Sequence, residues 1–201
     1  MSHIKFNPRT LILLIFILVV GMLRVLVPVI GDIKVLANYS AIGAIALFGG
    51  SYFNNNAKAF AFPLLTLLIS DVILSLTVYK AYSNGAFLYE GWYWVYGAFA
   101  LMTLVGKLVI KKPNVISFVA ATIVVVLIHW IVTDFGMWYG NPSFPQTLAG
   151  FWVVLEMAIP FEFRFLYGTL GYGAIMFGSF EFLKYKYPVL SFNNKETVAG
   201  I

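Results

Sequence analysis

The sequence predicts an all-α membrane protein with six transmembrane helices. Three observations support this: composition, apolar stretches of membrane-spanning length, and basic residues gathered between alternate stretches. The 201-residue chain is 61% hydrophobic and only 10% charged, whereas soluble domains are roughly half apolar and about a quarter charged. A span needs ~20 apolar residues, so a chain of this length holds about six of them. We therefore expect one polytopic membrane domain, residues 1–201.

The apolar stretches place the spans in order along the chain. They lie at about 10–29, 38–53, 59–79, 92–110, 115–135 and 162–185, with a short additional helix at 147–159. As a helix, residues 38–53 would be about 24 Å long, which is less than the ~30 Å membrane core. This second span is therefore short, packed inside the protein, or partly re-entrant. Its small residues predict a helix-packing face, made of Ser40, Ala44, Ala46 and Gly50.

Pro160 separates the short helix from the last span. Proline has no backbone N–H and interrupts a helix, so the stretch AIPFEFR predicts a helix break near Pro160. A broken helix at membrane depth is tolerated where it is buried or lines a cavity. The break therefore indicates a binding cavity.

Basic residues predict the orientation. The loops 30–38, 80–91 and 136–147 are expected on the side opposite the N-terminus, and their only basic residues are Lys34 and Lys80. The segments on the N-terminal side hold Lys5, Arg9, Lys58, Lys107, Lys111, Lys112, Lys184, Lys186 and Lys195. Since basic residues concentrate in cytoplasmic loops, we expect both termini in the cytoplasm and the protein in the bacterial inner (plasma) membrane.

Several classes of function are disfavoured by the residues that are missing. The chain has no cysteine and only two histidines, His3 and His129, which excludes disulfides and thiolate metal sites. It contains no GxSxG, HExxH or P-loop motif. The net charge of +5 forms no basic stripe, so we expect no nucleic-acid partner. We predict that the protein is not an enzyme and uses no cofactor and no metal.

Ionisable residues within spans are costly and are functional candidates by default. Arg24 and Asp71 are expected at similar depth, as a structural ion pair or with one of them contacting a solute. Glu162 and Arg164 are two residues apart, so they do not face each other on a helix and each needs another partner. Glu156 points either into a cavity or into water at the outer surface.

The stretch VVLIHWIVTDFGMWY contains two further candidates. His129 and Asp134 are about 140° apart around a helix, so a direct pair is not expected. Asp134 is either a surface carboxylate or a ligand-binding group, and His129 is either a packing residue or a ligand-binding one. The aromatic residues at loop edges form an interfacial belt or stacking walls for a planar ligand. The candidate ligand-binding residues are Asn38, Asp71, Trp94, His129, Asp134, Trp138, Glu156, Glu162 and Arg164.

Five stretches together resemble one protein family. They are NYSAIGAIALFGGSYF, AFPLLTLLISDVIL, TDFGMWY, FPQTLAGFWVVLEMAIPF and FGSFEF, and the resemblance runs from about Arg24 to Phe182. In order and spacing they resemble small bacterial proteins related to the substrate-binding S-components of energy-coupling-factor vitamin transporters. In this comparison Asp134 replaces a usual asparagine, Glu162 an apolar residue and His129 an aromatic one. Gly168-Thr169 stands where Gly-Asp is usual.

The resemblance implies a six-helix S-component fold and a function in uptake. The solute would be vitamin-like and would bind from outside, between segments 30–38, 80–94 and 134–164. Partners would be a membrane coupling subunit and its ATPases. The expected function is the solute-binding subunit of a vitamin or micronutrient importer. The alternative is a scaffold or assembly subunit of a larger membrane complex, docking through the small-residue face of the second span.

Overall fold

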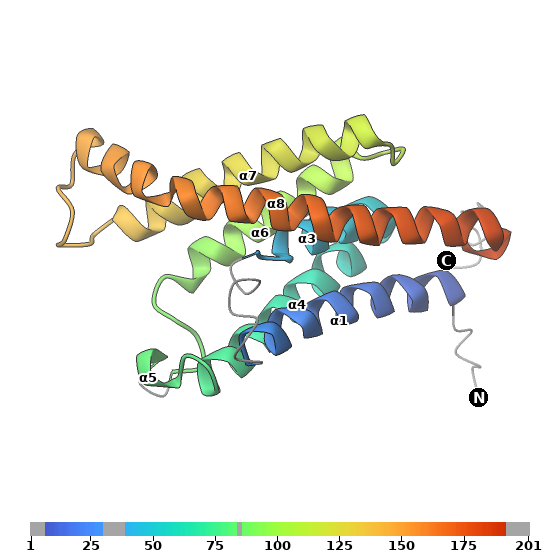
Figure 1. Cartoon of the computed structure of the whole chain (residues 1–201), viewed down its shortest axis with the longest axis horizontal. Coiled ribbons are helices and arrows are strands. Elements are labelled where there is room, and N and C mark those ends of the chain that lie inside the picture. Colours follow the sequence, from blue (N-terminus) through green and yellow to red (C-terminus); the bar gives the residue numbers. More distant parts are fainter. Residues whose placement is uncertain (1–6, 30–38, 84–85, 192–201) are drawn as a thin grey trace.

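The computed structural model describes residues 7–29, 39–83 and 86–191, and these residues form helices without any β-strand. Figure 1 shows the long helices running roughly along one axis. The helices are α1 (Pro8–Val29), α3 (Ile42–Tyr52), α4 (Asn56–Leu76), α5 (Lys80–Ser83), α6 (Trp92–Val109), α7 (Val115–Trp138) and α8 (Leu148–Lys186), followed by a 3-10 turn at Pro188–Leu190. The all-α prediction is confirmed.

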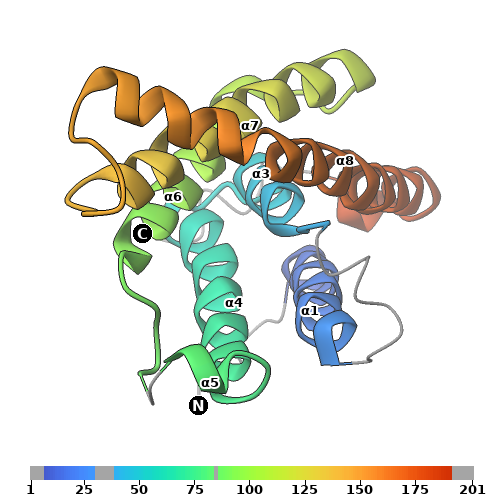
Figure 2. The same ribbon diagram turned by 60° about the vertical axis from the view of Figure 1, so that its left-hand side comes forward.

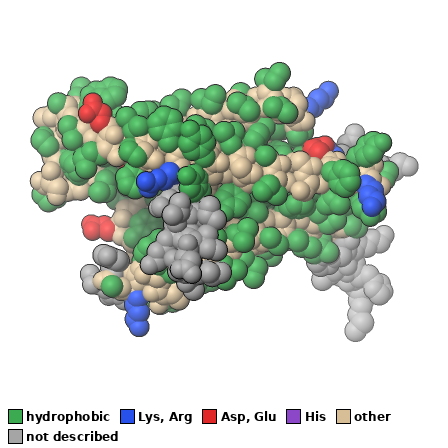
Figure 3. Space-filling view, in the orientation of Figure 1, with side chains coloured by type: hydrophobic (Ala, Val, Ile, Leu, Met, Phe, Trp, Pro, Cys, Tyr) green, Lys and Arg blue, Asp and Glu red, His purple; other side chains and the backbone are tan. Residues whose placement is uncertain are grey.

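Four of these helices, α1, α4, α6 and α7, are long and apolar enough to cross a membrane. Their outer faces are apolar too: Met22 on α1 is 62% exposed and Ile131 on α7 is 51% exposed. Hydrophobic side chains cover most of the surface in Figure 3. Soluble proteins rarely expose so large an apolar surface to water, so we assign these helices to a membrane. The count of six spans stays a prediction, because α3 is shorter and α8 does not meet the same criterion.

The short helix α3 is the centre of the fold. Residues 43–50 are all buried, and α3 packs against α1, α4, α6, α7 and α8, as Figure 2 shows for its nearest neighbours. Glycines allow α3 and α6 to approach each other closely. A Cβ atom on Gly50 would lie 2.1 Å from the carbonyl oxygen of Thr103, and one on Gly106 would lie 2.6 Å from that of Leu47. The small-residue face of the second span therefore packs within the protein itself.

The last helix corrects the sequence prediction. Residues 148–186 form one continuous helix with Pro160 inside it, so the predicted break and the separate helix at 147–159 are wrong. One missing N–H removes one backbone hydrogen bond, whereas a break in lipid would leave several backbone groups unpaired. The helix accommodates the proline on an exposed face, and in Figure 1 its first turns run obliquely to the rest.

A polar clamp fixes the end of the bundle where α1 begins and α8 ends. The Arg9 guanidinium donates to the carbonyl of Leu190 at 2.5 Å and to that of Tyr52 at 3.0 Å. The Tyr52 hydroxyl donates to Glu181 at 2.6 Å, and Lys184 donates to the same carboxylate at 2.8 Å. The start of α1, the end of α3 and the end of α8 are therefore joined at one end of the molecule.

The glycine contacts lead to a first prediction. Gly106→Ala places a methyl group against the backbone of α3, and overpacking of this kind costs about 1–3 kcal/mol. Gly97→Ala, on the same helix, has no atom within 4 Å of the new Cβ and is expected to be neutral or slightly stabilising, since alanine favours helix over glycine. Thermal unfolding of both variants in detergent measures the difference. Equal unfolding temperatures would contradict the central role of this contact.

Candidate functional site

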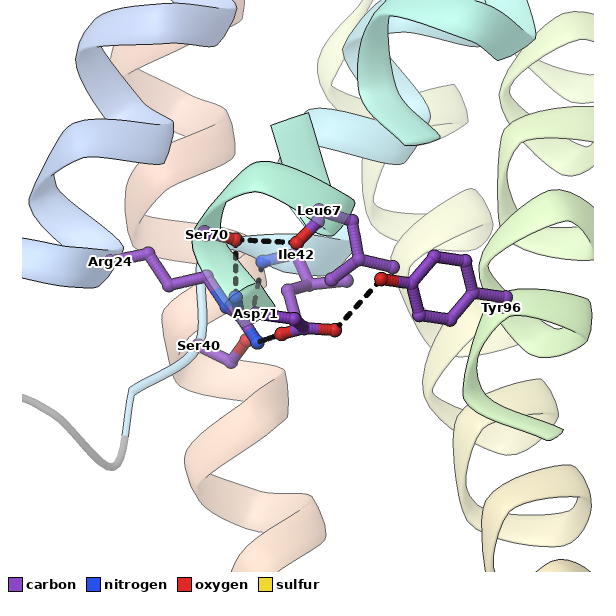
Figure 4. Close-up of polar contacts among 7 residues, drawn as sticks. All are labelled: Arg24, Ser40, Ile42, Leu67, Ser70, Asp71 and Tyr96. Carbon is purple, nitrogen blue, oxygen red and sulfur yellow. Dashed lines mark hydrogen bonds and ion pairs between the residues drawn. The ribbon is translucent and has the colours of Figure 1, made fainter. Parts of the chain in front are cut away.

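A buried polar cluster, which we call the Arg24 cluster, joins α1, α4 and α6 (Figure 4). It consists of Arg24, Ser70, Asp71 and Tyr96. The Arg24 guanidinium lies 2.6 Å from Asp71 Oδ1 and also donates to the Ser70 hydroxyl. The Tyr96 hydroxyl donates to the other carboxylate oxygen of Asp71 at 3.1 Å. Both oxygens of Asp71, a residue only 3% exposed, are therefore hydrogen-bonded.

Further polar groups lie around the Arg24 cluster. Ser70 completes its own pairing by donating to the Leu67 carbonyl at 2.8 Å, and Ser40 accepts the Ile42 N–H at the start of α3 at 3.3 Å. The loop before α6 also approaches: burial raises the pKa of the Tyr89 hydroxyl above its ordinary value, and the negative charge of Asp71 adds to the shift. The charge of Asp71 therefore acts on Tyr89 in the loop before α6.

A small cavity of about 140 Å³ adjoins the Arg24 cluster. Its wall is formed by α1, the segment before α3, the end of α4, the turn after α4, and the middle of α8. The polar groups come from Arg24, Tyr39, Ser40, Tyr79 and Tyr172, and apolar residues of α1, of α4 and of the segment before α3 complete the wall. The cavity therefore combines three tyrosine side chains with one guanidinium. This cavity is the candidate binding site.

A second buried group, the acidic cluster, lies between α7 and α8 and consists of His129, Asp134 and Glu162. His129 Nδ1 is 2.7 Å from Glu162 Oε1, and its ring stacks on Phe165 with centroids 4.2 Å apart. Asp134, five residues further along α7 and partly buried, is included because the charges of Glu162 and His129 act on its carboxylate. Oδ2 of Asp134 and Oε2 of Glu162 are buried and have no hydrogen-bond partner in the described part of the chain.

The other predicted residues lie apart from both clusters and from the cavity. Glu156 is exposed, and the Arg164 guanidinium lies 5.3 Å from the centre of the Phe161 ring. The structure therefore gives Glu162 and Arg164 different surroundings, as their spacing predicts. Asn38 lies outside the described residues.

Two predicted tryptophans pack against their own chain. The ring of Trp94 lies 5.1 Å from that of Phe135 and covers Gly136. Trp138 Nε1 donates to the Pro145 carbonyl at 2.8 Å. Neither residue lines the cavity. These rings close the end of the α7–α8 hairpin.

Sequence reasoning missed the tyrosines of the cavity and Ser70. The available signal was weak, since Tyr39, Tyr79 and Tyr172 lie near predicted span ends or in a glycine-rich stretch, where aromatic residues are common. Among the described residues, no group of three or more His, Asp or Glu side chains could hold a metal ion. The site as described therefore offers hydrogen-bonding groups and aromatic faces.

The family pattern of one group of proteins matches residues 4–190 of the chain. The chain belongs to the family of unknown function DUF6580. No curated protein and no solved structure matches it. The match covers the cavity and both polar clusters of this DUF6580 protein. It does not link the protein to S-components, so that relationship stays a prediction.

The Arg24 cluster of the DUF6580 protein gives a second prediction. Asp71→Ala leaves a guanidinium at membrane depth without its counter-charge, and breaking a buried pair in this way costs about 3–5 kcal/mol. The double variant Arg24→Met with Asp71→Leu is expected to regain most of that stability, because an apolar pair of similar size needs no counter-charge. Unfolding of the two single variants and the double variant measures the coupling between the residues. Additive losses would show that the pair contributes nothing.

Proposed function

We propose that this protein binds a small polar solute within the membrane and serves as the solute-binding subunit of a vitamin or micronutrient importer. The observation that carries the proposal is the cavity beside the Arg24 cluster. Polar side chains at membrane depth are costly, and those that border a hollow typically mark a solute site. The family resemblance in the sequence supports the same function.

The size and chemistry of the cavity narrow the solute. Its volume of about 140 Å³ is well below the ~300–1,000 Å³ of pockets for drug-sized ligands. A single ring or a short polar molecule fits, as would one ring of a larger molecule. Asp71 already neutralises Arg24, so the site suits a neutral group with hydroxyl, carbonyl or amide functions. The tyrosine rings offer faces for a planar part.

The cavity lies where α1 and α4 end, next to segments 30–38 and 77–91 in the chain. In the proposed orientation, with both termini cytoplasmic, this end faces outward. A solute would therefore enter from outside, past the segments 30–38, 80–94 and 134–164. Release on the inner side would require a coupling subunit and ATPases as partners.

The scaffold alternative has less support from the packing. It assigned the small-residue face of the second span to a partner protein, but Ala44 and Ala46 are fully buried and Gly50 contacts the backbone of α6. That face is occupied within the chain. A scaffold function would need another surface.

The orientation can be tested because the chain has no cysteine. Ser143→Cys, in the loop after α7, is expected to react with a membrane-impermeant maleimide in intact cells. Lys112→Cys, in the loop before α7, is expected to react only after the membrane is opened. Both positions are exposed, so burial does not explain a difference. The reverse pattern of labelling would overturn the orientation.

Solute binding is tested first by mass spectrometry of small molecules that co-purify with the protein, then by thermal shift with the molecules found and with a vitamin panel. Tyr172→Phe removes one hydrogen bond, worth about 0.5–1.5 kcal/mol, and is expected to weaken binding roughly two- to tenfold. Tyr185→Phe is the control, because Tyr185 is 88% exposed on the same helix. Empty screens, or equal effects of the two variants, would argue against this site.

A further inference from the structure

The acidic cluster is not explained by the proposed solute site, since none of its three side chains lines the cavity. Glu162 is among the most deeply buried charged residues described, with its side chain 8% exposed. One of its oxygens contacts His129 at 2.7 Å, and the other has no hydrogen-bond partner within residues 7–29, 39–83 and 86–191. Over the same residues, a buried oxygen of Asp134 also has no partner. Buried polar atoms are normally paired, so the two open oxygens need an explanation.

We propose that His129, Asp134 and Glu162 form a proton-binding site and hold one proton in common at neutral pH. With a neutral imidazole and both carboxylates ionised, the cluster would hold two negative charges between α7 and α8, each acting on the other. A nearby like charge disfavours the ionised form of a carboxyl group, and burial adds to this effect. A proton on His129 supplies a counter-ion for Glu162, and a proton on either carboxyl group turns an open acceptor into a donor.

No other cation compensates the cluster among the described residues. The charged groups that act on Asp134 are Glu162 and His129, and α7 packs against α3, α6 and α8. The remaining titratable groups on these helices have other surroundings. Those exposed to solvent or lipid are Tyr93, Glu156, Tyr167, Tyr185 and Lys186. Those with other partners are Arg164 over Phe161, Tyr96 on Asp71, Tyr52 and Lys184 on Glu181, Lys107 on carbonyls at the end of α3, and Tyr172 in the cavity wall.

The geometry favours a proton over a metal ion. A metal ion needs several ligands around one point, and no such group of His, Asp and Glu occurs in the described residues. A proton needs only one acceptor and a neighbouring partner, which the His129–Glu162 contact provides. The stacking of His129 on Phe165 and its contact with Glu162 hold the imidazole against α8.

Two spectroscopic measurements on the purified full-length protein in lipid nanodiscs test the proposal. The chain has two histidines, so His3→Gln leaves His129 as the single imidazole, and ¹⁵N NMR then reads its protonation directly. Infrared spectroscopy detects the C=O stretch of a protonated carboxyl group. At pH 7 we expect an imidazolium signal from His129 or a protonated-carboxyl band. A neutral imidazole without such a band at pH 7 overturns the proposal. This measurement leaves His129, Asp134 and Glu162 unsubstituted.

Variants identify the residues involved. Asp134→Asn and Glu162→Gln are each expected to shift or remove the signal, whereas Glu156→Gln, which alters an exposed carboxylate on the same helix, is expected to leave it unchanged. A signal unaffected by both cluster variants, or one abolished by Na⁺ at constant pH, overturns proton binding at this site. Unfolding temperatures establish that each variant is folded. Solute binding is measured separately, so failure of the cavity proposal leaves this test intact.

Discussion

The close contact between α3 and its neighbours is the constraint on which the rest of the structure depends. Membrane helices gain little from burying apolar surface against each other, because lipid is equally apolar, and they associate through close packing and polar contacts. Gly50 and Gly106 let the backbones of α3 and α6 meet directly, and Gly43 leaves room for the side chain of Thr169 of α8. A helix of eleven residues can therefore serve as the core around which the longer helices are arranged.

The polar side chains of the two clusters differ in how completely they are hydrogen-bonded. The Arg24 cluster pairs every oxygen of Asp71, which is the pattern of a structural tie between helices. The acidic cluster has two carboxylate oxygens without a partner in the described residues, and this difference is the reason that we assign a proton to it.

Much of the fold could be predicted from the sequence, and the limits have physical causes. Apolar stretches located α1, α4, α6 and α7 to within a few residues, and Arg24 and Asp71 lie together as expected. Pro160 was misread because the cost of a proline depends on what surrounds the helix. Glu162 could not be named as the partner of His129, since contacts between helices depend on rotation about each axis. That rotation is set by how the helices pack, and the spacing of residues within one helix gives no information about it.

The two candidate sites share one face of α8. Glu162, Phe165, Thr169 and Tyr172 follow one another at intervals of three and four residues, so they form a single stripe along the helix. Glu162 belongs to the acidic cluster, Tyr172 lines the cavity, and Thr169 lies between them with a buried hydroxyl that has no partner in the described residues. Since a helix is stiff over ten residues, a rotation of α8 that changed one site would also turn the other. Opposite this stripe stands α3, whose Gly43 lies against Phe165 and Thr169, so the packing of α3 on α8 orients the helix that carries both sites.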